Sequence, residues 1–135
     1  MNTTDKAMTI LVVDDDPDFL LQEQVQLRAA GYTVIAAPGR AEAEELLETV
    51  KPDMAMIDLM MEDVDAGFTL CHHIKKRYPD CPVIMITGVT SETGLEIDAV
   101  TRGEKSWIKA DAILPKPVRF EQLERELRRL LPASR

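Results

Sequence analysis

Short apolar segments alternate with longer helical segments along the chain, and this alternation limits the fold more than any other feature. Thr9-Ile-Leu-Val-Val13, for example, is apolar without polar residues at alternate positions, as in strands covered on both faces. Strands separated by helices favour a parallel sheet, because the crossover helices cover both of its faces. The sequence therefore predicts an α/β fold with a doubly wound five-stranded parallel sheet, whose expected strands are 9–13, 33–37, 53–57, 82–86 and 112–114.

Five helical segments are expected between and after these strands. The first begins at Asp16-Pro17, where an aspartate cap precedes a proline in the first turn, and ends before Gly31. Its expected apolar positions are Phe19, Leu20, Val25 and Leu27. The other helical segments are 41–51, 68–78 after a loop through 65–67, a segment opened by Thr93-x-x-Glu96, and an amphipathic stripe over 120–131.

Length and charge exclude several classes of protein. A chain of 135 residues is expected to form a single domain over 1–135. Its net charge of −8 argues against direct nucleic-acid binding, because surfaces that bind phosphates are basic. No apolar run approaches the roughly 20 residues of a membrane helix, and the N-terminus has no signal-peptide pattern. With Cys71 and Cys81 expected as reduced thiols, the prediction is a cytoplasmic protein that does not bind membranes.

Polar residues lie at or just past the ends of four of the five expected strands. The first strand precedes Asp14-Asp15-Asp16, the third precedes Asp58, the fourth ends at Thr87, and Lys116 follows the fifth. In a parallel sheet these residues meet at one edge, where ligands bind. Two like charges 4 Å apart repel by about 4 kcal/mol at an effective dielectric of 20, and Mg²⁺ would relieve this repulsion. Carboxylates, Mg²⁺, a lysine and a hydroxyl fit phosphoryl transfer with an aspartate nucleophile, although composition alone leaves open which aspartate attacks.

Four motifs in order resemble the receiver domain of two-component response regulators. They are Ile10-Leu-Val-Val-Asp-Asp-Asp-Pro17, Pro52-Asp-Met-Ala-Met-Ile-Asp58-Leu-Met-Met61, Val83-Ile-Met-Ile-Thr87-Gly88 and Leu114-Pro-Lys116-Pro117. The resemblance covers a core of about residues 9–131. It implies a flavodoxin-like strand order of 2-1-3-4-5.

The resemblance also implies roles for individual residues. Asp58 would be the phospho-acceptor, Lys116 would bind a phosphoryl oxygen, and the Thr87 hydroxyl would move to bond another. Asp58 would receive its phosphoryl group from a sensor histidine kinase, a phosphotransfer protein or a small phosphodonor. The domain would catalyse its own phosphorylation and dephosphorylation and would not be a multi-turnover enzyme.

A magnesium site is implied in the same way. Asp15, Asp58 and the backbone carbonyl of Met60 would bind Mg²⁺ directly. Asp14 would act through a metal-bound water. The cofactor expected from the resemblance is therefore Mg²⁺ alone.

The sequence departs from the family pattern at three places. In the loop after Asp58, Glu62 replaces the usual proline and Ala66 is an additional residue. Ile113 replaces the aromatic residue that usually precedes the lysine by three positions. The segment between Thr87 and Lys116 is longer than usual, so a helical insertion is expected around 103–109. Trp107 in this insertion would be a buried aromatic or a partner-binding anchor.

The function expected is a phosphorylation-controlled switch whose surface near the fourth helix and fifth strand controls an unknown partner protein. The chain would be a single-domain regulator, a phosphorelay intermediate or a receiver excised from a longer regulator. A phosphate-dependent homodimer through the fourth helix, last strand and fifth helix is also plausible. Two alternatives stay open: a small Mg²⁺-dependent phosphatase of the haloacid dehalogenase type that uses Asp14, and a degenerate receiver that only binds partners.

Overall fold

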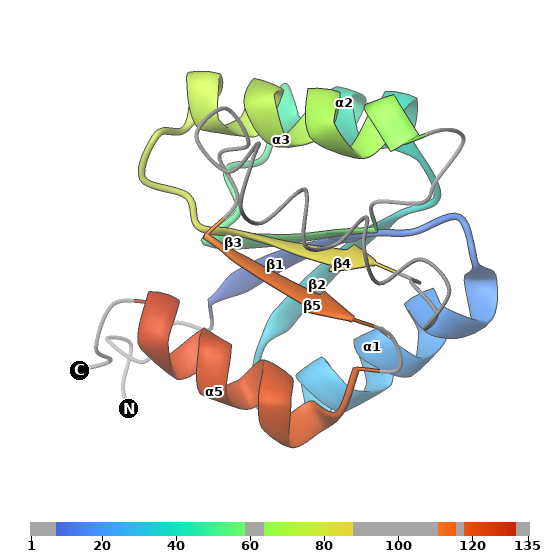
Figure 1. The fold of residues 1–135 in the computed structure, drawn as a ribbon, viewed down its shortest axis with the longest axis vertical. Helices are drawn as coiled ribbons and strands as arrows, with labels where there is room; N and C mark the ends of the chain where they lie inside the picture. The colour runs from blue at the N-terminus through green and yellow to red at the C-terminus, as the bar shows by residue number, and fades with distance from the viewer. Residues whose placement is uncertain (1–7, 59–63, 88–110, 116–117, 132–135) are drawn as a thin grey trace.

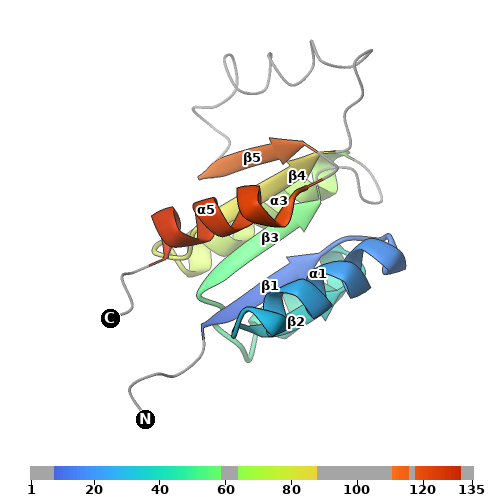
Figure 2. The ribbon, with the colours of Figure 1, turned by 90° about the horizontal axis from the view of Figure 1, so that it is seen from below.

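A five-stranded parallel sheet forms the middle layer of the computed structural model, which describes residues 8–58, 64–87, 111–115 and 118–131. The strand order is β2-β1-β3-β4-β5, as the family resemblance implies. α2 and α3 cover one face of the sheet, and α1 and α5 cover the other (Figures 1 and 2). The strands are β1 (Thr9–Val13), β2 (Thr33–Ala37), β3 (Met54–Asp58), β4 (Val83–Thr87) and β5 (Ala112–Pro115).

The five predicted strands are therefore confirmed, with ends that differ by at most one residue. The helices of the described residues are α1 (Pro17–Ala29), α2 (Arg40–Leu47), α3 (Val64–Arg77) and α5 (Phe120–Leu130). The helix expected after Thr93 and the insertion expected around 103–109 lie outside the described residues.

Two helix predictions need correction. α3 begins at Val64, so the expected loop through 65–67 is helical. Ala66 and Gly67 are buried there, and packing against the sheet outweighs the low helix propensity of glycine. α2 ends at Leu47, four residues before the expected end at Lys51. The backbone N–H groups of Glu48 and Thr49 bond carbonyls three residues back, which is the tighter turn that often closes a helix.

The core divides into two clusters, because side chains alternate between the faces of each strand. Leu11 and Val13 of β1 belong to the cluster under α2 and α3. Ile10 and Val12 belong to the cluster under α1 and α5, together with Leu123 of α5. Each strand is thus apolar on both sides, which explains why the strand segments show no polar alternation in the sequence.

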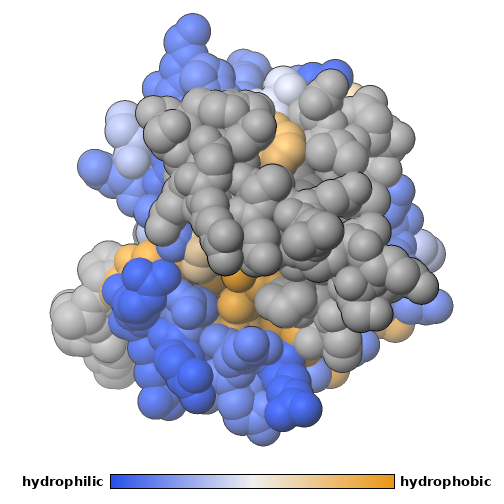
Figure 3. Space-filling view, viewed as in Figure 1, coloured by the Kyte–Doolittle hydropathy of each residue, from blue (hydrophilic) through white to orange (hydrophobic). Residues whose placement is uncertain are grey.

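α5 shows the amphipathic pattern predicted for the last helix. Leu123 and Leu127 are fully buried against the sheet. Its outer side carries charged residues, and the space-filling view shows hydrophilic residues over this helix, with apolar residues between it and the sheet (Figure 3). Glu124 and Arg128 form an i,i+4 ion pair at 3.4 Å. No helix among the described residues has both the length and the apolar character needed to cross a membrane.

α1 begins as predicted, but its buried stripe differs from the prediction. Asp16 is the N-cap, its carboxylate accepts a hydrogen bond from the N–H of Asp18, and a proline occupies the first turn. Val25, expected at an apolar position, is 59% exposed. The stripe facing the core is Leu20, Glu23 and Leu27, so a glutamate occupies a core position.

Candidate functional site

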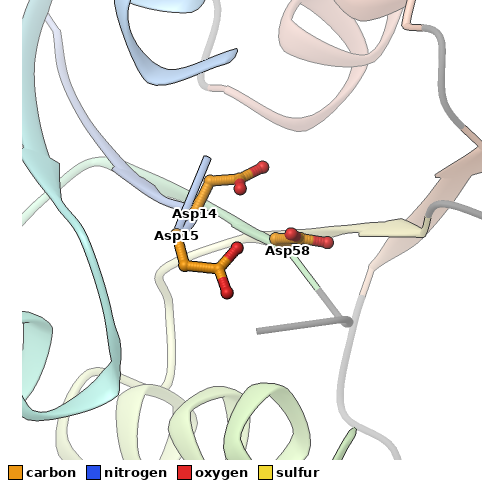
Figure 4. A group of neighbouring side chains, drawn as sticks. All are labelled: Asp14, Asp15 and Asp58. Carbon is orange, nitrogen blue, oxygen red and sulfur yellow. The ribbon is translucent and has the colours of Figure 1, made fainter. Parts of the chain in front are cut away.

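The carboxyl ends of β1 and β3 bring three aspartates together. The two strands are neighbours, and Val13 of β1 pairs with Ile57 of β3. The next residues are Asp14, which directly follows β1, and Asp58, the last residue of β3, so the two lie at adjacent strand ends. Carboxylate oxygens of Asp14, Asp15 and Asp58 all lie within 4.8 Å of one another (Figure 4). The predicted convergence of acids from two separate segments is confirmed.

The three carboxylates differ in their exposure to water. Asp14 is fully buried and Asp58 is 2% exposed, whereas Asp15 is exposed. The adjacent Asp14 and Asp15 direct their carboxylates to opposite sides of the strand, Asp14 toward the layer of α1 and α5 and Asp15 toward α3 (Figure 4). A ligand at this cluster would therefore meet acids from both sides of the β1 end.

Hydrogen bonds donated by backbone N–H groups fix the turn that carries the first two acids. The N–H of Asp14 donates to the carbonyl of Ala37 at the end of β2, with a donor–acceptor distance of 3.2 Å. The Asp14 Oδ1 atom accepts a hydrogen bond of 2.8 Å from the N–H of Asp16. Since Asp16 caps α1, the cluster is joined directly to the start of that helix. Asp16 is thus a structural residue, and Asp14 and Asp15 form the cluster with Asp58.

The donor set of this cluster suits a hard divalent cation. Carboxylate oxygens are the preferred ligands of Mg²⁺, which usually keeps several waters and binds only a few protein groups. Three acids within 4.8 Å also repel one another, and a cation would offset that repulsion. Asp14, Asp15 and Asp58 would hold such a cation, and the ion would supply positive charge for the oxygens of a phosphoryl group.

The remaining predicted site residues are only partly described. Thr87 is the last residue of β4, and the preceding Ile86 pairs with Asp58, so the β4 end adjoins the end of β3. β5 ends at Pro115, which pairs with Thr87 and directly precedes Lys116 in the sequence. Lys116 and Met60 lie outside the described residues, as does Trp107.

Sequence reasoning missed a fourth acid close to this site. Glu23 of α1 is fully buried, and burial, followed by the negative charge of Asp14, raises its pKa to about 7. Neither of its carboxylate oxygens has a hydrogen-bond partner among the described residues. Its spacing from Leu20 and Leu27, three and four residues away, is the sequence signal that would have placed it on the inward stripe.

A family model described as the response regulator receiver domain matches residues 10–128. The chain belongs to this family. The receiver is 35% identical over 124 residues to the DNA-binding dual master transcriptional regulator RpaA of Synechocystis sp.. It is 34% identical over 122 residues to the heme response regulator HssR of Staphylococcus aureus. These alignments cover 90% of this chain but 48% and 50% of the relatives, so the chain spans about half their length.

Solved structures show the same fold. The chemotaxis response regulator CheY4 of Vibrio cholerae superposes with a TM-score of 0.78 at 26% identity, covering 93% of this receiver and all of that chain. The response regulator TrrA of Thermotoga maritima, in complex with Mg²⁺-BeF, has a TM-score of 0.73 at 25% identity, covering 92% and 99% of the two chains. The predicted family and strand order are thereby confirmed. The alternative of a haloacid dehalogenase-type phosphatase is not supported.

Two departures of this receiver from the family pattern fall on described residues. Ile113 in β5 is half-buried and packs against the core cluster under α2 and α3, so an aliphatic side chain fills this position. Ala66 is 5% exposed and lies in the first turn of α3, where the additional residue is absorbed into the helix. Both departures are accommodated by packing within the layer of α2 and α3.

Proposed function

We propose that this receiver is a phospho-acceptor switch in which Asp58 takes a phosphoryl group in the presence of Mg²⁺. The single observation that carries the proposal is the gathering of Asp14, Asp15 and Asp58 within 4.8 Å at the ends of β1 and β3. Phosphoryl transfer depends mainly on positioning and on neutralising charge, and an acidic cluster that holds a cation supplies both.

Asp58 is the proposed nucleophile because of its place in the cluster. It is the last residue of β3, between β1 and β4, so it adjoins both the acids of β1 and the end of β4 at Thr87. In the proposed reaction a carboxylate oxygen of Asp58 attacks phosphorus, and the bond from phosphorus to the donor's leaving group breaks. The product is an aspartyl phosphate, and the donor departs with the electron pair of the broken bond.

The other residues have supporting roles in this proposal. Asp14, Asp15 and the Met60 carbonyl help Asp58 to hold Mg²⁺, and Lys116 and Thr87 contact oxygens of the bound phosphoryl group. The acidic cluster and the relative described in complex with Mg²⁺-BeF support the choice of cation. The chain would promote its own phosphorylation and dephosphorylation and would not act as a multi-turnover enzyme.

The proposed phosphodonor is a sensor histidine kinase or a phosphotransfer protein, and the output is a change of surface near β5 that a downstream protein reads. A phosphate-dependent homodimer is a second form of that output. RpaA is described as DNA-binding, and this chain covers only 48% of it. We assign no nucleic-acid contact to these 135 residues, because their net charge is −8. A receiver with this role would work in the cytoplasm.

The test is to trap the acceptor chemically. The protein is incubated with Mg²⁺ and acetyl phosphate, and the labile acyl phosphate is reduced with borohydride before peptide mass spectrometry. Modification is expected on Asp58, with complete loss in Asp58→Asn. Asp53→Asn is the matched control, since Asp53 is an exposed aspartate at the opposite end of β3 and should leave the modification unchanged.

Other outcomes would identify the alternatives. Modification of Asp14 that survives Asp58→Asn would contradict the assignment of the nucleophile. The absence of any adduct, together with no change on adding beryllofluoride, would indicate a receiver that only binds partners. Either result would overturn the proposed switch.

A further inference from the structure

The buried Glu23 has no evident structural role in the core where it lies. Its side chain is fully buried on α1, between Leu20 and Leu27 on the stripe that faces the sheet. Both leucines belong to the apolar cluster under α1 and α5. Neither Glu23 oxygen receives a hydrogen bond from a described residue. A carboxyl group buried without a donor destabilises a fold, so its presence calls for a compensating partner.

Glu23 lies on the same side of the sheet as Asp14 and Asp58. Val12 of β1 and Met56 of β3 point into the core under α1 and α5, and Asp14 and Asp58 follow them by two residues. Side chains two apart on a strand share a face. Figure 4 shows the Asp14 carboxylate directed toward this layer. Glu23 of α1 therefore stands on the side of the sheet to which Asp14 points.

The electrostatics of Glu23 lead to the same neighbour. Burial is the larger cause of its raised pKa, and the charge of Asp14 is the second. Two acids that repel each other in a layer poor in water would both be stabilised by one nearby cation. The cluster of Asp14, Asp15 and Asp58 is the place among the described residues where three acids can hold a metal ion.

We infer that Glu23 is a fourth acid of the cation site, which strengthens the binding of a divalent cation at Asp14, Asp15 and Asp58 through its charge, without being a ligand itself. This inference rests on the proposed Mg²⁺ site. The ionised Glu23 adds negative potential behind Asp14. The bound cation in turn offsets the negative charge of Glu23, for which the surrounding apolar side chains provide no compensation. Glu23 is thus a positioning residue: it acts on the cation through its electrostatic field, from within the layer of α1 and α5.

Charge can be separated from packing by two substitutions. Glu23→Gln keeps the shape and removes the charge, and Glu23→Leu also replaces the polar group with a side chain suited to this core. Glu45→Gln is the control, because it makes the same chemical change at an exposed position on α2. Each protein is titrated with magnesium chloride by isothermal titration calorimetry at pH 8.5, where Glu23 is ionised, and is melted in the presence of a chelator.

Opposite effects on the two measurements are expected. Both Glu23 variants should bind Mg²⁺ about three- to tenfold more weakly than the wild type, which corresponds to a screened attraction from a charge outside the ligand shell. In chelator both should melt at a higher temperature, because an uncompensated buried charge is gone. Glu45→Gln should match the wild type in Mg²⁺ affinity. A purely structural Glu23 would change the melting temperature and leave the affinity unaltered.

The failures of this inference and of the proposed function are distinguishable. If the wild type binds Mg²⁺ and both Glu23 variants bind it equally well, the role of Glu23 is refuted and the switch stands. Weaker binding in Glu23→Gln but not in Glu23→Leu would also refute a charge effect. If the wild type itself binds no Mg²⁺ at pH 8.5, the cation site and the role of Glu23 fall together.

Discussion

Aspartates stand at both ends of the parallel strands, and the two ends hold them differently. At the amino ends, Asp53 precedes β3 and accepts a hydrogen bond of 2.7 Å from the N–H of Thr9, the first residue of β1. Asp111 precedes β5, and its Oδ2 atom accepts bonds of 2.8 Å from the N–H of Val83 and from the Lys75 ammonium. At the carboxyl ends, three aspartates gather within 4.8 Å of one another.

The comparison separates structural acids from functional ones. Each amino-end carboxylate joins two neighbouring strands through a backbone N–H, so it aligns the sheet where the strands begin. At the carboxyl end, three carboxylates lie close together, and their mutual repulsion would be offset by a bound cation. The same residue type therefore serves stability at one edge of the sheet and, in the proposed function, would serve ligand binding at the other. Removing acids from the two ends should change the free energy of unfolding in opposite directions.

The largest effect is expected at the amino end, from Asp111→Ala. This change removes a 2.8 Å ion pair with Lys75 of α3 and leaves the partly buried N–H of Val83 without its acceptor. The free energy of unfolding should fall by about 2 kcal/mol, as for other hydrogen bonds to charged groups. Urea denaturation followed by circular dichroism measures it.

The control for this prediction is Asp80→Ala, which removes an exposed aspartate near the same end of the sheet. It should change the free energy of unfolding by less than about 0.5 kcal/mol. Mg²⁺ affinity should be unchanged in both variants. A loss of Mg²⁺ binding in Asp111→Ala would break the proposed separation between the two ends.

Much of the sheet and its carboxyl edge follows from the sequence, because both depend on local pattern. The five apolar segments predicted the strands to within one residue, and the acids placed directly after two of them predicted the cluster. The amino-end contacts were not predictable in this way. Asp53 meets Thr9 across 44 positions and Asp111 meets Val83 across 28, and no local pattern in the sequence indicates which backbone N–H an aspartate will reach.

The errors in the helices have a related cause. Gly67 marks a loop by local propensity, but α3 buries it and the helix begins at Val64. In α1 the apolar pattern favoured Val25, whereas the direction of the helix over the sheet turns Glu23 inward. Which stripe of a weakly amphipathic helix faces the core is decided by tertiary packing. The burial of Glu23 in the core could therefore be recognised only from the structure.

An effect of intermediate size is expected from pH, through Glu23. Its pKa is about 7 in the folded protein against an ordinary value of 4.5, so the folded state holds this proton more tightly than the unfolded chain. Raising the pH from about 4.5 to about 7 should then lower the free energy of unfolding, with no further change from this group above that range. The loss should be about 1–2 kcal/mol in the absence of divalent cations, less than the roughly 3 kcal/mol of the full shift, because the folded protein relaxes and admits water around a buried charge.

Glu23→Gln isolates this contribution, since it cannot titrate. The difference in unfolding free energy between wild type and variant should be measured by denaturation in chelator at a series of pH values. The variant should gain relative to the wild type as the pH rises through the window. A difference that stays constant with pH, or that changes in the opposite sense, would show that Glu23 is not an uncompensated buried acid.

The smallest effect is expected at the carboxyl end, from Asp15→Asn. Asp15 is exposed and its carboxylate lies within 4.8 Å of those of Asp14 and Asp58. Removing its charge relieves repulsion that water partly screens, so the cation-free protein should gain about 0.5–1 kcal/mol in unfolding free energy. The wild type should be stabilised by added Mg²⁺, because a ligand that binds only the folded state shifts the equilibrium toward it. Asp15→Asn should lose most of that response. A variant that is destabilised in chelator, as Asp111→Ala should be, would mean that Asp15 supports the fold in the same way as the amino-end acids.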